Sequence, residues 1–289
     1  MTSPNKDIGV TRCGGMEFHW GERTYVMGII NLSPDSFSGD GVTGVEAAVA
    51  QARYFASVGA DILDVGGEST RPRSTPVSVS EEIRRVVPVI ERIVAEVSLP
   101  ISVDTYKLEV AEPALEAGAA IINDQWGLKQ DPRLAELAAD KGIPLILMSN
   151  QRDKGGYDAG NQRDTAYYDD VMAEVISSLK KSLEQALGVG VPRENIILDP
   201  GIGFGKTWQQ DLEIIRRLKE LEELGRPVLV GPSRKSLIKM VLDLPADDRV
   251  EGTAATIAVS IANGTDIVRV HDVKQMVRVC RMTDALVRS

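Results

Sequence analysis

The feature that most constrains this chain is a regular alternation of short apolar runs with longer amphipathic stretches, which begins near residue 24. Such alternation is typical of parallel α/β units. We expect strands at Tyr25–Asn31, Asp61–Gly66, Ile101–Asp104, Ala120–Asn123, Leu145–Met148, Ile196–Asp199, Val228–Gly231 and Ile267–His271. Several of these runs are apolar at consecutive positions, as strands buried on both faces require.

Helical spacing of apolar residues predicts helices around residues 83–97, 171–188 and 212–225, and Gly225 is a C-cap candidate for the last. Eight strand–helix units in about 260 residues indicate an α/β fold of the (β/α)8 TIM barrel type. A doubly wound open sheet is the rival fold, but no dinucleotide fingerprint opens the first unit.

The predicted domain organisation is an N-terminal lead-in, residues 1–23, followed by a single barrel domain, residues 24–289. Cys13-Gly14-Gly15 can turn a small hairpin within the lead-in. The longest polar stretch, residues 150–164, is expected to be a loop after the fifth strand.

Charge and composition exclude several classes of function. The net charge of −9 argues against nucleic acid or an anionic membrane as the main partner. Met1–Val10 is polar, so we expect neither a secretion signal nor a membrane segment there. The two cysteines, Cys13 and Cys280, lie at opposite ends of the chain, which favours reduced thiols and a cytoplasmic location.

Polar residues follow seven of the eight predicted strands. A barrel places its active site at the C-terminal ends of its strands, so these side chains are expected on one rim. The residues are Asn31, Glu68, Asp104, Asn123, Asp199, Lys235, Ser236, Arg269 and His271. They predict a pocket with acids and amides on one side and cations on the other.

The stretch Asn195–Thr207 combines a strand-end acid, Asp199, with three closely spaced glycines and Lys206. A carboxylate at a strand end is costly to desolvate without a partner, and glycines allow a ligand to approach the backbone. A phosphate-binding P-loop is excluded by spacing, because Pro200 occupies the position of its first glycine. A tight strand-to-helix turn with a solvated acid remains the simpler alternative.

The successive segments MGIINLSPDSFSGDG, GADILDVGGESTRP, ISVDT, AAIINDQWG, LDPGIGFGK, VGPSRKS and VRVHD resemble the motifs of the dihydropteroate synthases, a family of pterin-binding enzymes. They occur in the family's order and span Met27 to Asp272. The resemblance implies a transferase of folate synthesis with a (β/α)8 barrel. It would condense 6-hydroxymethyl-7,8-dihydropterin diphosphate with 4-aminobenzoate to 7,8-dihydropteroate and diphosphate.

This resemblance assigns the pterin site. Asp199 can accept both N–H groups of the pterin's aminopyrimidinone edge in a charge-assisted pair. The other residues expected there are Asp104, Asn123, Gly203, Phe204 and Lys235. For Asp104 and Asn123 the alternative is hydrogen bonding within the barrel.

The diphosphate is expected at the eighth strand, where Arg269 and His271 alternate with valines and so point to one side. Asn31 lies on the neighbouring first strand of a closed barrel, and it matches the family's metal position. The resemblance therefore implies Mg²⁺ as cofactor, with waters and substrate phosphates as its other ligands.

The aminobenzoate site implied by the resemblance consists of Phe37, Thr70, Arg71, Pro72, Lys235 and Ser236. Residues with a catalytic role would be Asp104, Lys235, Arg269 and His271. The resemblance also implies a homodimer formed through outer helices, with small molecules as the remaining partners.

Five residues at four places depart from the family's pattern: Ser149-Asn150, Trp126, Arg73 and Lys239. Two other functions therefore stay open. A pterin-binding methyltransferase barrel would share the pterin acids but need neither the aminobenzoate loops nor the diphosphate cations. A catalytically inactive paralogue would bind pterins without turnover. Lys206 has no assigned role, although it can pair with a neighbouring acid and hold the turn.

Overall fold

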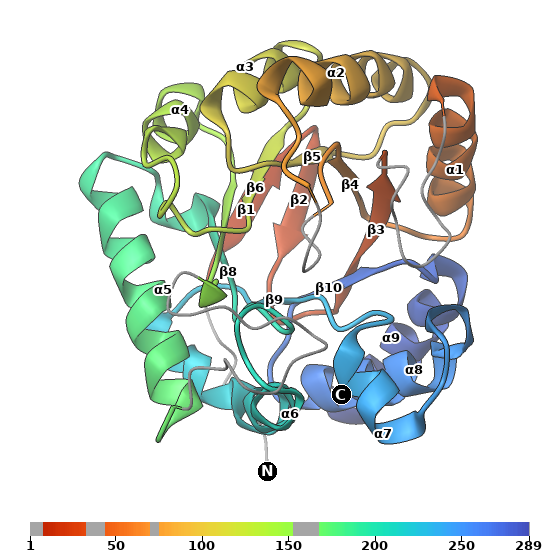
Figure 1. Ribbon diagram of the computed structural model, residues 1–289, viewed down its shortest axis with the longest axis vertical. Helices are drawn as coiled ribbons and strands as arrows, with labels where there is room; N and C mark the ends of the chain where they lie inside the picture. The colour runs from red at the N-terminus through yellow and green to blue at the C-terminus, as the bar shows by residue number, and fades with distance from the viewer. Residues whose placement is uncertain (1–7, 33–43, 70–74, 153–167, 289) are drawn as a thin grey trace.

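The computed structural model describes residues 8–32, 44–69, 75–152 and 168–288. Eight parallel strands form one sheet in the order β8-β7-β6-β5-β4-β3-β10-β9, with helices packed around it (Figure 1). A parallel bridge between Leu198 and Val228 joins the two outermost strands, so the sheet closes on itself. The fold is the predicted (β/α)8 TIM barrel.

The barrel strands end within one residue of their predicted bounds. They are β3 (Tyr25–Asn31), β4 (Ile62–Gly66), β5 (Ile101–Asp104), β6 (Ile121–Asp124), β7 (Leu145–Met148), β8 (Ile196–Asp199), β9 (Leu229–Val230) and β10 (Ile267–Val270). Because helices cover the outside of the barrel, both faces of each strand are buried, and this explains the apolar runs in the sequence.

The described helices are α1 (Val45–Ser57), α2 (Val79–Glu96), α3 (Leu108–Glu116), α4 (Arg133–Lys141), α5 (Val171–Gly188), α6 (Trp208–Arg217), α7 (Ser236–Leu242), α8 (Val250–Ala262) and α9 (Val273–Val287). Short 3-10 segments are η2 (Arg193–Asn195), η3 (Leu218–Leu224) and η4 (Ala246–Asp248). The helix predicted at residues 212–225 is thus divided between α6 and η3, and Gly225 ends it with the left-handed φ of 60° expected of a C-cap glycine.

The N-terminal hairpin closes one end of the barrel. β1 (Val10–Cys13) pairs antiparallel with β2 (Met16–His19), and Figure 1 shows both in the centre of the ring of strands. The turn falls at the predicted glycines, since Gly14 and Gly15 both have positive φ. Phe18 and Trp20 pack with the lowest inward-facing apolar side chains of the barrel, so this end is filled. A ligand site must therefore lie at the opposite mouth.

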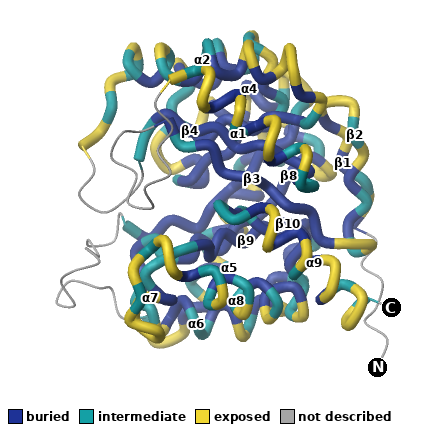
Figure 2. The backbone as a smooth tube through the Cα atoms, turned by 90° about the vertical axis from the view of Figure 1, so that its right-hand side faces the viewer, coloured by how far each residue is buried: buried dark blue, intermediate teal, exposed yellow. Residues whose placement is uncertain are grey.

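Burial follows this arrangement: Figure 2 shows the barrel strands buried and the exposed residues on the outer faces of the helices. Among the residues that the structure describes, no helix combines the length and the apolar composition needed to cross a membrane.

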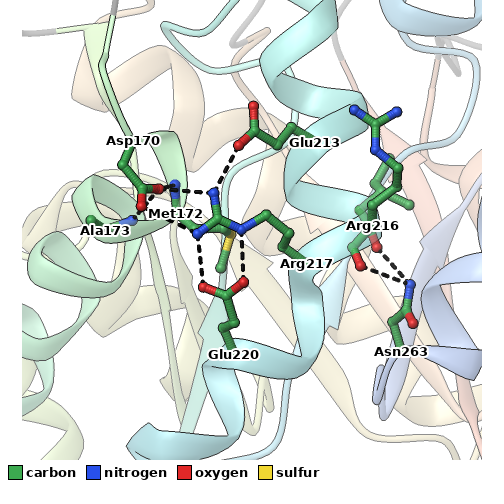
Figure 3. Close-up of polar contacts among 9 residues, drawn as sticks. Asp170, Met172, Ala173, Glu213, Arg216, Arg217, Glu220 and Asn263 are labelled. Atoms are coloured by element: carbon green, nitrogen blue, oxygen red, sulfur yellow. Dashed lines mark hydrogen bonds and ion pairs between the residues drawn. The ribbon is translucent and has the colours of Figure 1, made fainter.

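An ion-pair network fixes the start of α5 against the end of α6 (Figure 3). Asp170 is the N-cap of α5 and accepts hydrogen bonds from the backbone N–H groups of Met172 and Ala173. Arg217 donates to the same carboxylate at 2.9 Å and to Glu220 at 2.7 Å. The network therefore connects the N-cap residue of α5 to the last residue of α6.

Candidate active site

The inward-facing side chains of the barrel form two chemically different layers. Side chains alternate in direction along a strand, so residues two apart share a face. The lower layer is apolar and rests on the N-terminal hairpin; it contains Met27, Ile62, Ile121, Ile146, Ile197, Leu229 and Ile267. Two residues further along their strands lie Asp64, Asn123, Asp199 and Arg269. The polar layer therefore faces the open mouth.

Arg269 occupies the centre of this polar layer. Its Nε donates to Asp64 Oδ2 at 2.6 Å, and its Nη2 donates to Asp104 Oδ2 at 2.7 Å. The expected separation of acids from cations across the pocket is thus wrong for Arg269. The physical reason is that buried carboxylates need a counter-charge, and one guanidinium fork can serve two of them.

Asp64 is a site residue that the sequence analysis missed. It is fully buried in the middle of β4, and Asn123 Nδ2 donates to both of its carboxylate oxygens at 3.3 Å. The sequence did indicate this residue. Asp64 is an acid inside an otherwise apolar strand, and it lies two residues before Gly66 and therefore on the same face of the strand, which is the face toward the barrel interior. The contact also leaves the amide oxygen of Asn123 as an acceptor for a ligand.

Asp104 and Asn123 are register neighbours on β5 and β6, as predicted. Burial raises the pKa of Asp104 to about 8; the charge of Arg269 opposes this shift, and the adjacent Asp64 carboxylate adds to it. Asp104 Oδ1 is buried and has no hydrogen-bond partner within the described part of the chain. An unsatisfied carboxyl oxygen at a barrel mouth is suited to bind a polar ligand edge.

Asp199 and the turn after β8 form the opposite wall. The backbone N–H of Gly201 donates to Asp199 Oδ1 at 2.7 Å, and burial raises the pKa of this carboxyl. Lys235 Nζ donates to the Ile202 carbonyl at 2.5 Å and lies 4.7 Å from the centre of the Phe204 ring. Burial lowers the pKa of Lys235 to about 8, although the charge of Asp199 opposes this shift.

Gly203 lies against the Lys235 stem, since a Cβ built on it would be 3.2 Å from the lysine Cδ. Phe204 is approached by a second cation, because Arg152 Cζ is 4.4 Å from its ring centre. The structure thus brings Asp199, Lys235, Gly203 and Phe204 together, and Arg152 is an addition that sequence reasoning did not find.

His271 follows β10 and contacts the hydroxyl of Ser233. Its backbone N–H donates to Ser233 Oγ at 3.2 Å, and its Nδ1 lies 3.0 Å from the same oxygen. Ser233 follows β9, so this contact joins the last two barrel strands at the mouth. Ser236 is the first residue of α7 and immediately follows Lys235.

Asn31 ends β3, where it is in register with Gly66 on one side, while β10 pairs along the other side of the strand. Within the described ranges no cluster of three acidic, histidine or cysteine side chains is arranged to hold a metal. The donor set nevertheless suits magnesium, because an amide oxygen is a hard ligand and Mg²⁺ usually keeps waters and substrate phosphates as its other ligands.

Phe37, Thr70, Arg71 and Pro72 lie outside the described residues, as does Arg73. The chain on either side of residues 70–74 is described, and Lys107 connects its two ends. Lys107 Nζ donates to Glu68 Oε2 at 2.5 Å, to the Val77 carbonyl at 2.7 Å and to Glu82 Oε2 at 2.7 Å. The sequence analysis did not identify this connection.

The remaining departures from the family's pattern lie around the mouth or on the surface. Trp126 packs edge-on against Tyr106, with ring centres 6.3 Å apart. Asn150 is buried, and its Nδ2 donates to the Gln125 carbonyl at 2.9 Å. Lys239 is exposed on α7. None of these contacts involves the carboxylates bound by Arg269.

Comparison with known proteins identifies one family. Residues 27–271 match the family described as pterin binding enzyme. The dihydropteroate synthase of Clostridium beijerinckii is 48% identical over 279 residues, which cover 96% of this chain and 99% of the relative.

Solved structures agree with this match. A dihydropteroate synthase from Clostridium difficile, crystallised in the presence of pteroic acid, is 45% identical and superposes with a TM-score of 0.85, covering 94% of this chain and 100% of that chain. The Xanthomonas albilineans dihydropteroate synthase with 4-aminobenzoic acid is 41% identical with a TM-score of 0.86, covering 96% and 97% of the two chains.

Proposed function

Because this chain belongs to the pterin-binding enzyme family, among its dihydropteroate synthases, we propose that it condenses 6-hydroxymethyl-7,8-dihydropterin diphosphate with 4-aminobenzoate. The protein is then a transferase that yields 7,8-dihydropteroate and diphosphate in folate biosynthesis. The observation that carries the proposal is the polar layer of the barrel mouth, where carboxylates and an amide surround one guanidinium.

The acids of this layer bind the pterin. Asp199 accepts the two adjacent N–H groups of the aminopyrimidinone edge, because a carboxylate matches such a donor pair. The Asn123 amide oxygen and the unpaired Asp104 Oδ1 bind other polar atoms of the heterocycle. Phe204 and the Lys235 stem supply an apolar face for the flat ring.

The cations and the amide nearest β10 bind the diphosphate. The bond between the methylene carbon and the diphosphate oxygen breaks, and the electron pair leaves with the diphosphate. Arg269 and His271 stabilise the developing negative charge. Asn31 would hold the magnesium ion, which would supply further positive charge to the phosphate oxygens.

The amine of 4-aminobenzoate then attacks the methylene carbon, forms the new C–N bond and releases one proton. No protein nucleophile is needed, because the pterin ring delocalises the positive charge left at carbon. Lys235 and Ser236 bind the carboxylate of the aminobenzoate. Phe37, Thr70 and Pro72 are assigned to its ring, and Arg71 is assigned to the same site.

The protein acts in the cytoplasm as a homodimer. Its cysteines support the location, because Cys13 and Cys280 are both free and buried. Exposed apolar side chains on the adjacent helices α7, α8 and α9 support the dimer. They include Met240, Val241, Val259, Met282 and Leu286.

A turnover assay tests the function. Purified protein is incubated with the pterin diphosphate, magnesium and 4-aminobenzoate, and dihydropteroate and diphosphate are quantified with each component omitted in turn. Equimolar formation of both products supports the proposal. Pterin binding without products would indicate an inactive paralogue, and methyl transfer from a methylated folate to a corrinoid would indicate the methyltransferase.

A further inference from the structure

Among the described residues, Lys206 is the largest charged side chain that is fully buried, with 1% of its surface exposed. Its Nζ donates to three backbone carbonyls: Ser149 at 3.0 Å, Gly201 at 2.9 Å and Phe204 at 3.0 Å. An ammonium has three N–H donors, so every donor is used within the protein. Lys206 therefore makes direct contact with no ligand, and its expected pairing with an acid is replaced by carbonyl contacts.

The three carbonyls belong to two different segments. Ser149 directly follows β7, whereas Gly201 and Phe204 bracket the turn after β8. The two segments are in close backbone contact, because a Cβ on Gly201 would lie 2.2 Å from the Ser149 oxygen and one on Gly205 would lie 2.4 Å from the Gln151 carbonyl carbon. Lys206 thus ties together segments whose backbones already touch.

The bracketed turn, residues 201–204, positions the surface that is proposed to bind the pterin ring. This surface, the pterin wall, consists of Asp199, Phe204 and Lys235. The first N–H of the turn donates to Asp199, its Ile202 carbonyl accepts from Lys235, and its last residue is Phe204. Moving either bracketing carbonyl would move these three contacts together. Among the described residues, the hydrogen bonds of Lys206 reach no other part of the site, and the Arg269 contacts lie on β4 and β5.

The charge of Lys206 is balanced nearby. Asp211 is buried, accepts from the Gly203 N–H at 2.9 Å and attracts the lysine, as does Asp199. A neutral side chain of equal length would remove the lysine donor from three buried carbonyls. Gly201 and Phe204 would keep the backbone N–H groups of Phe204 and Gln151, whereas the Ser149 carbonyl would lose the hydrogen bond that ties it to the turn. The turn would then relax toward another arrangement.

We propose that Lys206 is a positioning residue for the pterin wall: it fixes residues 201–204 against the end of β7, so that Asp199, Phe204 and Lys235 present one preformed surface to the heterocycle. This inference rests on the proposed function for the identity of the ligand. It predicts that loss of Lys206 weakens pterin binding selectively, while the diphosphate subsite at Arg269 and His271 is retained.

The test compares Lys206→Met with Lys129→Met. Lys129 donates to the carbonyl of Asn150, one residue beyond Ser149, so this variant controls for loss of a lysine–carbonyl contact on the same segment. The probes are 6-hydroxymethylpterin and magnesium diphosphate, titrated separately by calorimetry. A wild type that does not bind the pterin would contradict the proposed function itself, and the Lys206 proposal is judged only against a wild type that binds.

For Lys206→Met we expect the pterin Kd to rise at least about tenfold, because charge-assisted hydrogen bonds that order the wall are lost, with the diphosphate Kd unchanged within about twofold. Lys129→Met should leave both Kd values at wild-type levels. The milder Lys206→Gln, which keeps a donor, should give an intermediate pterin Kd. Equal losses for both probes, no loss for either, or unfolding of both Lys206 variants would overturn the proposal.

Discussion

The Arg269 guanidinium donates to the Asp64 carboxylate at 2.6 Å, and this carboxylate is fully buried. The contact joins β10 to β4, two strands that are separated by β3 in the sheet. A buried ion pair of this kind is weak evidence for stability but strongly penalises the loss of one partner. Arg269, the residue proposed to bind the diphosphate, therefore also connects β10 to β4 and β5.

A double-mutant cycle on this pair should show strong coupling. Arg269→Met removes the donor shared by two buried carboxyl groups and leaves Asp64 without its counter-charge, which should lower the free energy of unfolding by about 3–5 kcal/mol. Asp64→Asn in the same chain should recover part of that loss, giving a coupling energy above about 1 kcal/mol in urea unfolding. Additivity within about 0.5 kcal/mol would mean that the pair is not energetically coupled.

The pH dependence of stability should report Asp104. Burial raises the pKa of this carboxyl to about 8, so between its ordinary value and pH 8 the folded state binds more protons than the unfolded state. Stability contributed by this group is therefore present at low pH and is lost as pH rises toward 8. The Tm of wild type minus that of Asp104→Asn should fall between pH 5 and about 8.5. A difference that is flat or rises would contradict the shift.

Lys107→Met should destabilise the protein far more than removal of an exposed lysine. The variant leaves Glu82, whose side chain is 1% exposed, and Glu68 without their shared cation. The expected loss is about 3–5 kcal/mol in the free energy of unfolding. Lys274→Met, at an exposed position on α9, should change it by less than about 0.5 kcal/mol. Similar losses in the two variants would show that the ion pairs of Lys107 with Glu68 and Glu82 do not contribute to the free energy of unfolding.

Two variants of the network in Figure 3 distinguish the contribution of helix capping to thermal stability from that of ion pairing. Asp170→Ala removes both the N-cap of α5 and the partner of Arg217, whereas Arg217→Ala removes only ion pairs between partly exposed groups. Thermal unfolding should therefore show a larger drop in Tm for Asp170→Ala, because exposed ion pairs contribute little. A larger drop for Arg217→Ala would assign the stability to the ion pairs instead.

The strands and the polar mouth could be predicted because both depend on local pattern. Apolar runs such as Leu145–Met148 are the pattern typical of strands that are buried on both faces, and their predicted bounds agree with the structure. The register of a closed barrel then brings Asp104 beside Asn123 without further information.

The contacts of individual cations could not be predicted in this way. Arg269 reaches across β3 to Asp64, and Lys206 reaches the Ser149 carbonyl after β7; both contacts depend on side-chain directions that strand order alone does not give. The division of residues 212–225 between α6 and η3 was equally hidden, because apolar spacing does not distinguish α from 3-10 turns over a few residues.

The measurement that tests the central claim most directly is the rate of dihydropteroate formation by wild type and by Asp199→Asn under identical conditions. In the proposed pterin complex, the substitution replaces one acceptor with a donor opposite the N–H groups of the pterin. We predict that wild type forms dihydropteroate and diphosphate in equal amounts and that the variant is slower by at least about a hundredfold, with an unchanged fold by circular dichroism. Equal rates for the two proteins, or no product from wild type, would contradict the account.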